Sequence, residues 1–290
     1  MRAQGGPAGP GVRKDEQGMR AQLPIRQVEK PWGRDELPSP FKAPAGERVG
    51  EIWFEPPADL PDLLVKYIFT SEKLSVQVHP SDTQTQAKGL GSQGKEECWL
   101  VIAADEGATL GIGFDEPIGA DAMRAAAVDG SIEQRMTWHP VAPGDFFYIP
   151  ANTVHAIGGG IALIEVQQNS DITYRLYDYG RPRELHLDEG MAVAKGERYD
   201  TGRWQRTVGE RDSVQLVDGP YFRLDQVKGA PSDEVAARYP GSFLVIPREG
   251  AVEIGGERIA AGECGLAKRL DDVRFGDDSV VLIAAGCDAR

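Results

Sequence analysis

Short runs of apolar and β-branched residues recur along the chain from Leu23 onward, separated by Gly, Pro and Asp. Clear examples are GEIWFE, LLVKYIFT, LSVQVHP, CWLVIAA, FFYIPA, IALIEVQQ and TYRLYDY. Such runs, bounded by turn residues, are typical of β-strands. Helices are expected only at residues 121–129 and after His186, where Asp188 is placed to cap the helix. The rhythm predicts an all-β chain with a few short helices, built as an antiparallel sandwich or barrel.

One stretch of the chain is used twice. Residues 142–166 (APGDFFYIPANTVHAIGGGIALIEV) align without gaps with residues 260–284 (AAGECGLAKRLDDVRFGDDSVVLIA). A glycine and an acidic residue match near the start, and apolar strands coincide at the end. In the second copy His155 is replaced by valine and Glu165 by isoleucine. We therefore expect two related β domains, of which only the first carries chemistry.

Length and composition set the domain plan. The chain has 290 residues, 41% of them hydrophobic, which is enough for one large or two medium cores. Residues 1–22 are rich in Gly, Pro and charge and are expected to form a disordered tail. The tetrapeptide MRAQ occurs at Met1 and again at Met19, which makes Met19 a candidate alternative start. The catalytic domain is placed at residues 23–205 and the second domain at residues 206–290.

Several classes of protein are disfavoured. A net charge of -13 opposes nonspecific binding to nucleic acids or anionic membranes, although clustered Lys and Arg residues can still bind a small anion. No run approaches the roughly 20 apolar residues of a membrane span, and the first residues lack the apolar block of a secretory signal. The three cysteines (Cys98, Cys264 and Cys287) form no CxxC pair, so we expect them to pack in the core. A cytoplasmic protein is predicted.

Polar residues share strand faces in two segments. In LSVQVHPSD, strand alternation sends Ser75, Gln77 and His79 to one face and the two valines to the other. In GKEECWLVI the same alternation places Lys95 and Glu97 on one face. Ser75 and His79 should lie roughly 13 Å apart at about 3.4 Å per residue.

A third segment, PANTVHAIGGG, contributes His155. Two imidazoles, one carboxylate and one amide oxygen suit a first-row divalent ion; zinc is preferred, and iron, manganese or cobalt also fit. A single strand histidine is more often structural than a ligand, so the argument rests on the group. His139 and His186 lie beside turns without comparable neighbours and are interpreted as structural or solvent-facing.

Gly144, Pro150 and His155 give the spacing G-x5-P-x4-H, which fits a tight turn, a strand ending at the proline, and a return that aims the histidine inward. This spacing resembles the second motif of the cupin superfamily, small β barrels that hold a metal inside. Where cupins usually carry HxH, this chain has QVH, and Glu97 follows His79 by 18 residues. The resemblance implies two cupin-like (jelly-roll) β barrels, the second degenerate and metal-free.

Longer motifs match a narrower family. KPWG, GEIW, LLVKYIFTSEKLSVQVHPSD, GKEECW, APGDFFYIPANTVHAIGGG and DITYRLYDYGRPRELH resemble the type I mannose-6-phosphate isomerases in their short bacterial form, over residues 30–186. The C-terminal third is similar only in general plan. The resemblance implies an aldose–ketose isomerase that interconverts mannose 6-phosphate and fructose 6-phosphate through an enediol, with one Zn²⁺ per chain, as a monomer or homodimer.

Site residues follow from the family position by position. The resemblance implies that the metal ligands are Gln77, His79, Glu97 and His155. It implies the catalytic residues Arg175, Lys95 and Glu165, and the substrate-binding residues Ser75, Lys66 and Arg181. The group that takes the C2 proton stays open between Glu165, Lys95 and a metal-bound water. Asn152 stands where the family commonly has glycine, and asparagine tolerates the left-handed backbone conformation.

Two rival functions remain. Another metal cupin enzyme, such as an oxygen-using dioxygenase, is expected to keep three histidines or an open facial triad. A non-catalytic cupin that only binds a sugar phosphate is expected to have lost a ligand or Arg175. This chain retains the four ligands and the arginine.

Overall fold

The structure is a computed structural model that describes residues 20–287. Residues 1–19, most of the expected disordered tail, lie outside the described part, as do residues 288–290. Gln22, at the end of that expected tail, forms an isolated antiparallel bridge with Gly265. No helix in the described part is long and apolar enough to cross a membrane.

The first β unit consists of two antiparallel sheets. The larger sheet has seven strands in the order β1-β2-β3-β10-β5-β8-β12. These are β1 (Ile25–Arg34), β2 (Val49–Phe54), β3 (Leu63–Phe69), β10 (Ile161–Gln168), β5 (Glu97–Ala104), β8 (Asp145–Ile149) and β12 (Gln205–Thr207). The smaller sheet has the order β11-β4-β9-β6-β7. Its strands are β11 (Tyr174–Tyr177), β4 (Val76–Val78), β9 (His155–Ile157), β6 (Thr109–Phe114) and β7 (Met136–Pro140).

The second β unit repeats this plan on a smaller scale. Its five-stranded sheet has the order β13-β14-β20-β15-β18, and its three-stranded sheet the order β17-β16-β19. The strands are β13 (Val214–Asp218), β14 (Phe222–Lys228), β20 (Val280–Gly286), β15 (Phe243–Glu249), β18 (Gly265–Ala267), β17 (Glu257–Ala260), β16 (Ala251–Ile254) and β19 (Val273–Phe275). The all-β prediction is confirmed. In both units the strands pair into separate open sheets, so hydrogen bonds between the described strands do not close a barrel.

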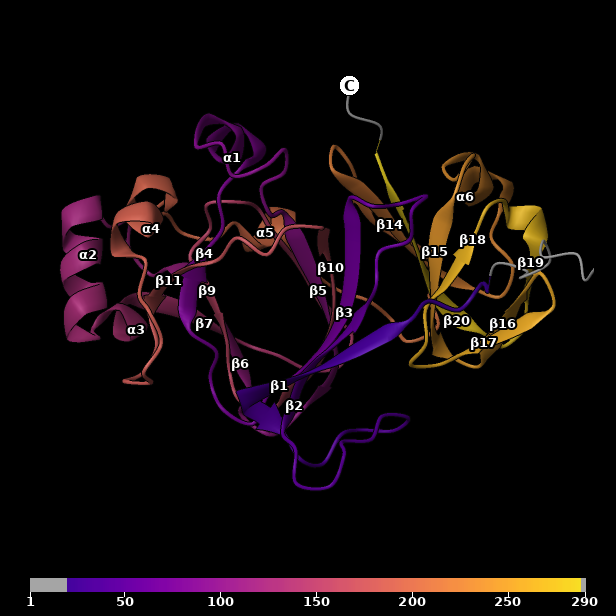
Figure 1. Ribbon diagram of the computed structural model, residues 1–290, viewed down its shortest axis with the longest axis horizontal. Helices are drawn as coiled ribbons and strands as arrows, with labels where there is room; N and C mark the ends of the chain where they lie inside the picture. The colour runs from indigo at the N-terminus through magenta and orange to yellow at the C-terminus, as the bar shows by residue number, and fades with distance from the viewer. Residues whose placement is uncertain (1–19, 288–290) are drawn as a thin grey trace, which may run out of the picture.

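The helices are short. They are α1 (Asp82–Ala87), α2 (Ala120–Asp129), α3 (Ile132–Arg135), α4 (Leu187–Val193), α5 (Thr201–Trp204), α6 (Asp233–Ala237) and the 3-10 helix η1 (Leu270–Asp272). Figure 1 shows α2, α3 and α4 at the end of the first unit remote from the second. Met123 of α2 and Val193 of α4 pack in one buried cluster with Val76 and Val78 of β4. These helices therefore cover the outer face of the strand that carries Gln77.

The internal repeat is visible in the strands. At the offset of the sequence alignment, β9 matches β19, and β8 and β10 overlap β18 and β20. The turns before β8 and β18 are also alike, because each contains a glycine with positive φ (+94° and +86°). After each glycine, a carboxylate accepts a hydrogen bond from a backbone N–H three residues earlier. Asp145 accepts from Ala142 at 2.9 Å and Glu263 from Ala260 at 2.7 Å.

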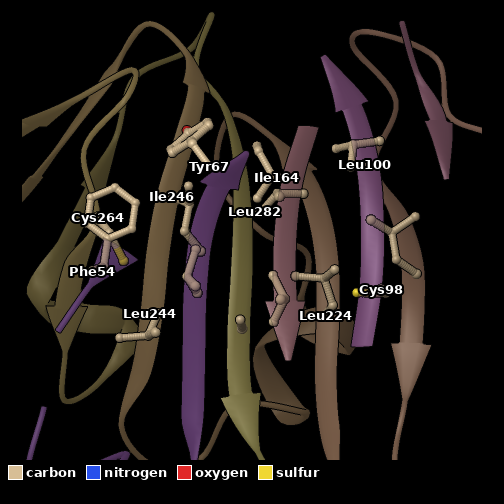
Figure 2. Close-up of a cluster of buried hydrophobic side chains, with 14 of the residues drawn as sticks. Phe54, Tyr67, Cys98, Leu100, Ile164, Leu224, Leu244, Ile246, Cys264 and Leu282 are labelled. Atoms are coloured by element: carbon tan, nitrogen blue, oxygen red, sulfur yellow. The ribbon is translucent and has the colours of Figure 1, made fainter. Parts of the chain in front are cut away.

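A shared hydrophobic cluster joins the two units. Figure 2 shows Tyr67, Leu100 and Ile164 of the first unit packed with Leu244 and Leu282 of the second. This cluster occupies the outer face of the seven-stranded sheet, while a separate cluster fills the space between the two sheets of the first unit. The predicted domain boundary, between residues 205 and 206, falls within β12, which pairs with β8 of the first unit.

Two local expectations differ from the structure. Asp188 does not cap α4; His186 is the N-cap, and Asp188 lies in the first turn, where it pairs with Arg124. Helix α1 was not expected, although Ser81 and Gln84 form a capping box at its start. That S-x-x-Q pattern is a helix-start signal present in the sequence.

Candidate metal centre and active site

The smaller sheet aligns three of the expected site residues in a row. Gln77 on β4 is paired with Arg175 on β11 on one side and with His155 on β9 on the other. Residues directly opposite each other in a sheet project from the same face. Ser75 donates a hydrogen bond from its Oγ to Gln77 Oε1 at 3.2 Å, which confirms that both residues share that face.

The larger sheet presents a second row toward the first. Glu165 on β10 is paired with Lys66 on β3 and with Trp99 on β5, and Gln167 is paired with Glu97. Lys66 Nζ donates to Glu165 Oε1 at 3.1 Å and to Gln167 Oε1 at 2.6 Å. Trp99 Nε1 donates to Glu165 Oε2 at 3.0 Å. All five side chains are buried.

His79, Glu97 and His155 form one cluster between the two sheets. Their ligand atoms lie within 4.8 Å of one another. Glu97 places Oε2 at 3.6 Å from His79 Nε2 and Oε1 at 3.4 Å from His155 Nε2. Ligands at about 2.0–2.1 Å from a tetrahedral zinc ion are separated by roughly 3.4 Å. The spacing therefore matches that of ligands around one small cation.

Backbone carbonyls fix the orientation of both imidazoles. His79 Nδ1 donates to Ile172 O at 2.9 Å, and His155 Nδ1 donates to Thr153 O at 2.9 Å. Each ring then presents an unprotonated Nε2 to the cluster, as metal-binding histidines do. Burial lowers the pKa of His155 to about 4 and that of His79 well below its usual value, so both rings are neutral near pH 7.

The remaining ligands complete the fit to a divalent cation. Both carboxylate oxygens of Glu97 are buried; Oε2 pairs with Lys95, whereas Oε1 has no hydrogen-bond partner among the described residues. A buried carboxylate oxygen without a partner is costly unless a cation binds it. Gln77 Nε2 lies 3.3 Å from His155 Nε2. Because the Oε1 and Nε2 atoms of a glutamine amide can be exchanged by a 180° rotation, the same side chain can place Oε1 beside His155 as a neutral oxygen ligand. Ser75 can then accept from the amide NH₂.

Lys95 touches two of these ligands. Its Nζ lies 2.5 Å from Glu97 Oε2 and 3.2 Å from His79 Nε2. Burial alone would lower the pKa of Lys95, but Glu165 and Glu97 outweigh it and raise that pKa. Burial raises the pKa of Glu97 despite Lys95, whereas Lys66 and Lys95 overcome burial at Glu165 and lower its pKa.

Two arginines have unsatisfied N–H groups beside the site. Arg175 donates from Nη1 to Glu184 O at 2.7 Å, while its buried Nε has no hydrogen-bond partner in the described part of the chain. Arg181 donates from Nη2 to Lys73 O at 2.6 Å, which brings it to the segment that leads into Ser75. Its Nη1 is likewise buried without a hydrogen bond there. Burial, followed by Arg183 and Arg181, lowers the pKa of Arg175.

The supporting contacts of Asn152 and Asp178 were not predicted from the sequence. Asn152 adopts a φ of +73°, as expected for a residue in place of glycine. It also donates from Nδ2 to His79 O at 3.3 Å and to Gln84 Oε1 at 2.7 Å, so it positions a ligand. Asp178 is buried and accepts from Arg183 at 2.6 Å and from Arg181 at 3.2 Å. Asp178 directly follows β11, and the run TYRLYDY gave no sign of its arginine partners.

The two other histidines have structural contacts. His139 is half-buried, lies 3.3 Å from Ile112 O through Nε2, and packs against Tyr199. His186 accepts from the backbone N of Arg175 at 3.2 Å. Their interpretation as structural residues agrees with these contacts, and His186 additionally steadies the strand that carries Arg175.

Curated relatives match about two thirds of the chain. The mannose-6-phosphate isomerase of Streptococcus mutans serotype c is 38% identical over 208 residues, 68% of this chain and 65% of that protein. ManA, the mannose-6-phosphate isomerase of Bacillus subtilis strain 168, is 42% identical over 211 residues, 69% of this chain and 64% of that protein. The putative mannose-6-phosphate isomerase YvyI of the same strain is 32% identical over 222 residues, 71% of this chain and 68% of that protein. The chain thus spans slightly less than two thirds of the first two relatives' length.

Solved structures share the fold. The crystal structure of the mannose 6-phosphate isomerase from Bacillus subtilis has a TM-score of 0.73 at 24% identity, covering 91% of this chain and 98% of that chain. A zinc-bound mannose 6-phosphate isomerase has a TM-score of 0.67 at 14% identity, covering 92% of this chain and 99% of that chain. At these identities the likeness extends to the fold alone. No family model matches the chain.

Proposed function

The chain belongs to the mannose-6-phosphate isomerase family, and on that premise we propose that it interconverts D-mannose 6-phosphate and D-fructose 6-phosphate with one bound zinc ion. The observation that carries the proposal is the buried His79–Glu97–His155 cluster. We further propose that the enzyme is cytoplasmic and acts as a monomer or homodimer.

Zinc is proposed from the chemistry of the donor set. Two neutral imidazoles and a carboxylate are typical zinc ligands, and the amide of Gln77 completes a set of four N and O donors. A protein of the same fold is described as zinc-bound, which supports the choice. When bound, zinc would act as a Lewis acid that polarises a sugar oxygen next to the reacting carbons.

The reaction moves a proton between C2 and C1. The C2 proton is removed to give an enediolate, a proton is delivered to C1, and the hydroxyl proton shifts between the two oxygens. Glu165 is ionised, because two lysines hold its pKa below its usual value, whereas Lys95 stays protonated. We therefore assign the removal of the C2 proton and the return of a proton to C1 to Glu165, and the transfer of the hydroxyl proton between the two sugar oxygens to Lys95.

Arg175 is assigned to the developing oxyanion. It is the cross-strand neighbour of Gln77, so its guanidinium projects from the face that carries Gln77 and His155. The unpartnered Nε is a donor that can hydrogen-bond to an anion forming beside these ligands. A group that touches the reacting oxygens only as charge develops lowers the barrier rather than merely tightening binding.

The phosphate is assigned to the end of the site marked by Ser75 and Arg181. Arg181 reaches the backbone of Lys73, two residues before Ser75. Within residues 20–287 its buried Nη1 has no hydrogen bond, and Glu72 Oε2 lies 3.9 Å from it. A phosphate oxygen is a strong acceptor for such a donor. Lys66, in contrast, donates hydrogen bonds to Glu165 and Gln167. We therefore assign it to the end of the site that binds the sugar, where it acts by holding Glu165.

The test is a coupled assay for fructose 6-phosphate formed from mannose 6-phosphate. We expect turnover by the zinc-loaded protein, loss of turnover after chelation, and recovery when zinc is restored. His155→Ala should abolish metal binding, whereas the matched variant His139→Ala should keep it. Absence of turnover by protein that contains stoichiometric zinc would rule out the proposed activity, and equal zinc content in the two variants would rule out the ligand set.

A further inference from the structure

A second cavity lies between the two β units, on the reverse of the strands that carry the site. Its volume is about 220 Å³. Tyr67 and Ile164 line it, whereas Lys66 and Glu165, the adjacent residues on β3 and β10, face the metal cluster. Figure 2 shows Tyr67 beside Ile164 and Ile246 at the margin of the shared hydrophobic cluster. The cavity is therefore separated from the proposed active site by the thickness of a sheet.

The wall of this cavity depends on a close approach of two segments. Gly262, in the turn of the second copy of the repeat, has a φ of +86°. A Cβ atom there would lie 2.6 Å from Pro40 Cγ. Glycine thus allows Pro40 and Phe41 to close over the cavity. The ring of Phe41 lies 4.5 Å from that of Tyr67, centroid to centroid, which gives the cavity an aromatic wall.

Among the residues that the structure describes, Arg248 is the one cation that lines this cavity. Arg248, near the end of β15, donates from Nη1 to Gln226 Oε1. Its Nε is buried and has no hydrogen-bond partner among the described residues. No carboxylate of the described chain lies within 4.0 Å of its guanidinium. Burial lowers the pKa of Arg248, although neighbouring Glu249 opposes the effect. An anion that accepts from Nε would satisfy this N–H and offset its desolvation.

The other charges restrict the class of anion. Glu210 and Glu249 also line the cavity and are exposed. Glu210 and Glu249 repel a dianion such as a sugar phosphate about twice as strongly as a monoanion, so a single carboxylate is the anion better suited to pair with Arg248. The volume is about seven times the ~30 Å³ of a water molecule in the liquid, room for one ring with its carboxylate.

We propose that this cavity is a binding site for a small monocarboxylate with an apolar or aromatic body. The carboxylate accepts hydrogen bonds from Arg248, and the body packs between Phe41, Tyr67 and Ile164. The site is independent of the metal and of the proposed isomerase reaction.

The test uses benzoate as the probe and measures binding by saturation-transfer NMR and by calorimetry on the full chain. Saturable benzoate binding is expected in zinc-loaded wild type and equally in His155→Ala, because the cavity does not touch the metal ligands. Benzyl alcohol, which has the ring without the charge, and inorganic phosphate, which has the charge without the ring, should bind at least about tenfold more weakly. Binding that disappears in His155→Ala would place benzoate on the metal and overturn the proposal.

Variants locate the probe within the cavity. Arg248→Met should weaken benzoate binding about tenfold or more, since it removes a charge-assisted hydrogen bond. Arg258→Met, an exposed arginine of the same unit outside the cavity lining, is the matched control and should bind like wild type. Ala261→Leu, which fills the cavity while keeping Arg248, gives a second variant and should also abolish binding. Thermal unfolding checks that each variant is folded. No saturable binding to wild type, or equal binding by all three variants, would overturn the proposal.

Discussion

Replacing Lys66 by methionine tests the energetic role of the buried pair behind the metal centre. The side chains of Lys66 and Glu165 are only 7% and 4% exposed, and the pair is joined at 3.1 Å. Methionine keeps the length of the side chain but removes the charge, so Glu165 remains as a buried carboxylate without that partner. Removing one member of a buried ion pair costs about 3–5 kcal/mol, because the other charge is left unpaired.

The local contacts place the expected cost at the low end of this range. Trp99 Nε1 still donates to Glu165 Oε2, and the charge of Lys95 still acts on Glu165. We therefore expect Lys66→Met to lower the free energy of unfolding by about 3 kcal/mol. The double variant Lys66→Met/Glu165→Leu should cost less than the sum of the single variants, because it leaves neither charge unpaired.

The assay is urea unfolding at neutral pH with excess zinc, followed by fluorescence and circular dichroism. Arg274→Met is the matched control, since Arg274 pairs with Glu253 at 3.4 Å but is 80% exposed, and surface pairs contribute little. If Lys66→Met changes stability no more than Arg274→Met, or if the two single effects simply add, the pair is not a coupled buried interaction and the reasoning fails.

Three further experiments test two supporting residues and the metal site. Asn152→Ala should lower the free energy of unfolding by about 2 kcal/mol, because it loses the side-chain hydrogen bond to His79 O and places alanine in the left-handed conformation, whereas Asn152→Gly keeps the turn. Urea unfolding distinguishes the two variants, and equal stability would contradict the role of the positive φ at residue 152. Asp178→Asn should raise KM for mannose 6-phosphate about tenfold with little change in kcat, because it releases Arg181 and Arg183. An unchanged KM in steady-state kinetics would contradict the role of Asp178 in positioning these arginines. Chelation should lower the Tm of wild type and leave that of His155→Ala unchanged, as measured by calorimetry; an equal decrease in both would place the bound metal elsewhere.

The sequence was sufficient to predict which residues share a face. Period-two alternation placed Ser75 with Gln77, and Lys95 with Glu97, and both pairings hold in the structure. The same alternation of IALIEVQQ places Glu165 and Gln167 together. The repeat likewise predicted two similar β units, because its turn glycines and terminal strands follow from short local patterns.

Pairing between strands is what the sequence could not supply. Gln77 lies between Arg175 and His155, which are remote in the chain, and nothing local fixes that register. The assignment of Lys66 to the substrate did not anticipate that its ammonium is held by Glu165 and Gln167. The junction between the units is also nonlocal, since it depends on packing of Tyr67 against residues of the second unit. The start of α1, in contrast, was predictable from its capping box.

The most direct test of the proposed chemistry is an NMR measurement of the reaction in D₂O. Zinc-loaded protein is incubated with mannose 6-phosphate, and the product is analysed for fructose 6-phosphate and for deuterium at C1. Proton transfer through Glu165 and Lys95 by way of an enediolate predicts fructose 6-phosphate that carries solvent deuterium at C1. Product without deuterium at C1 would contradict the predicted transfer of a proton that exchanges with solvent, and the absence of product would contradict the proposed function itself.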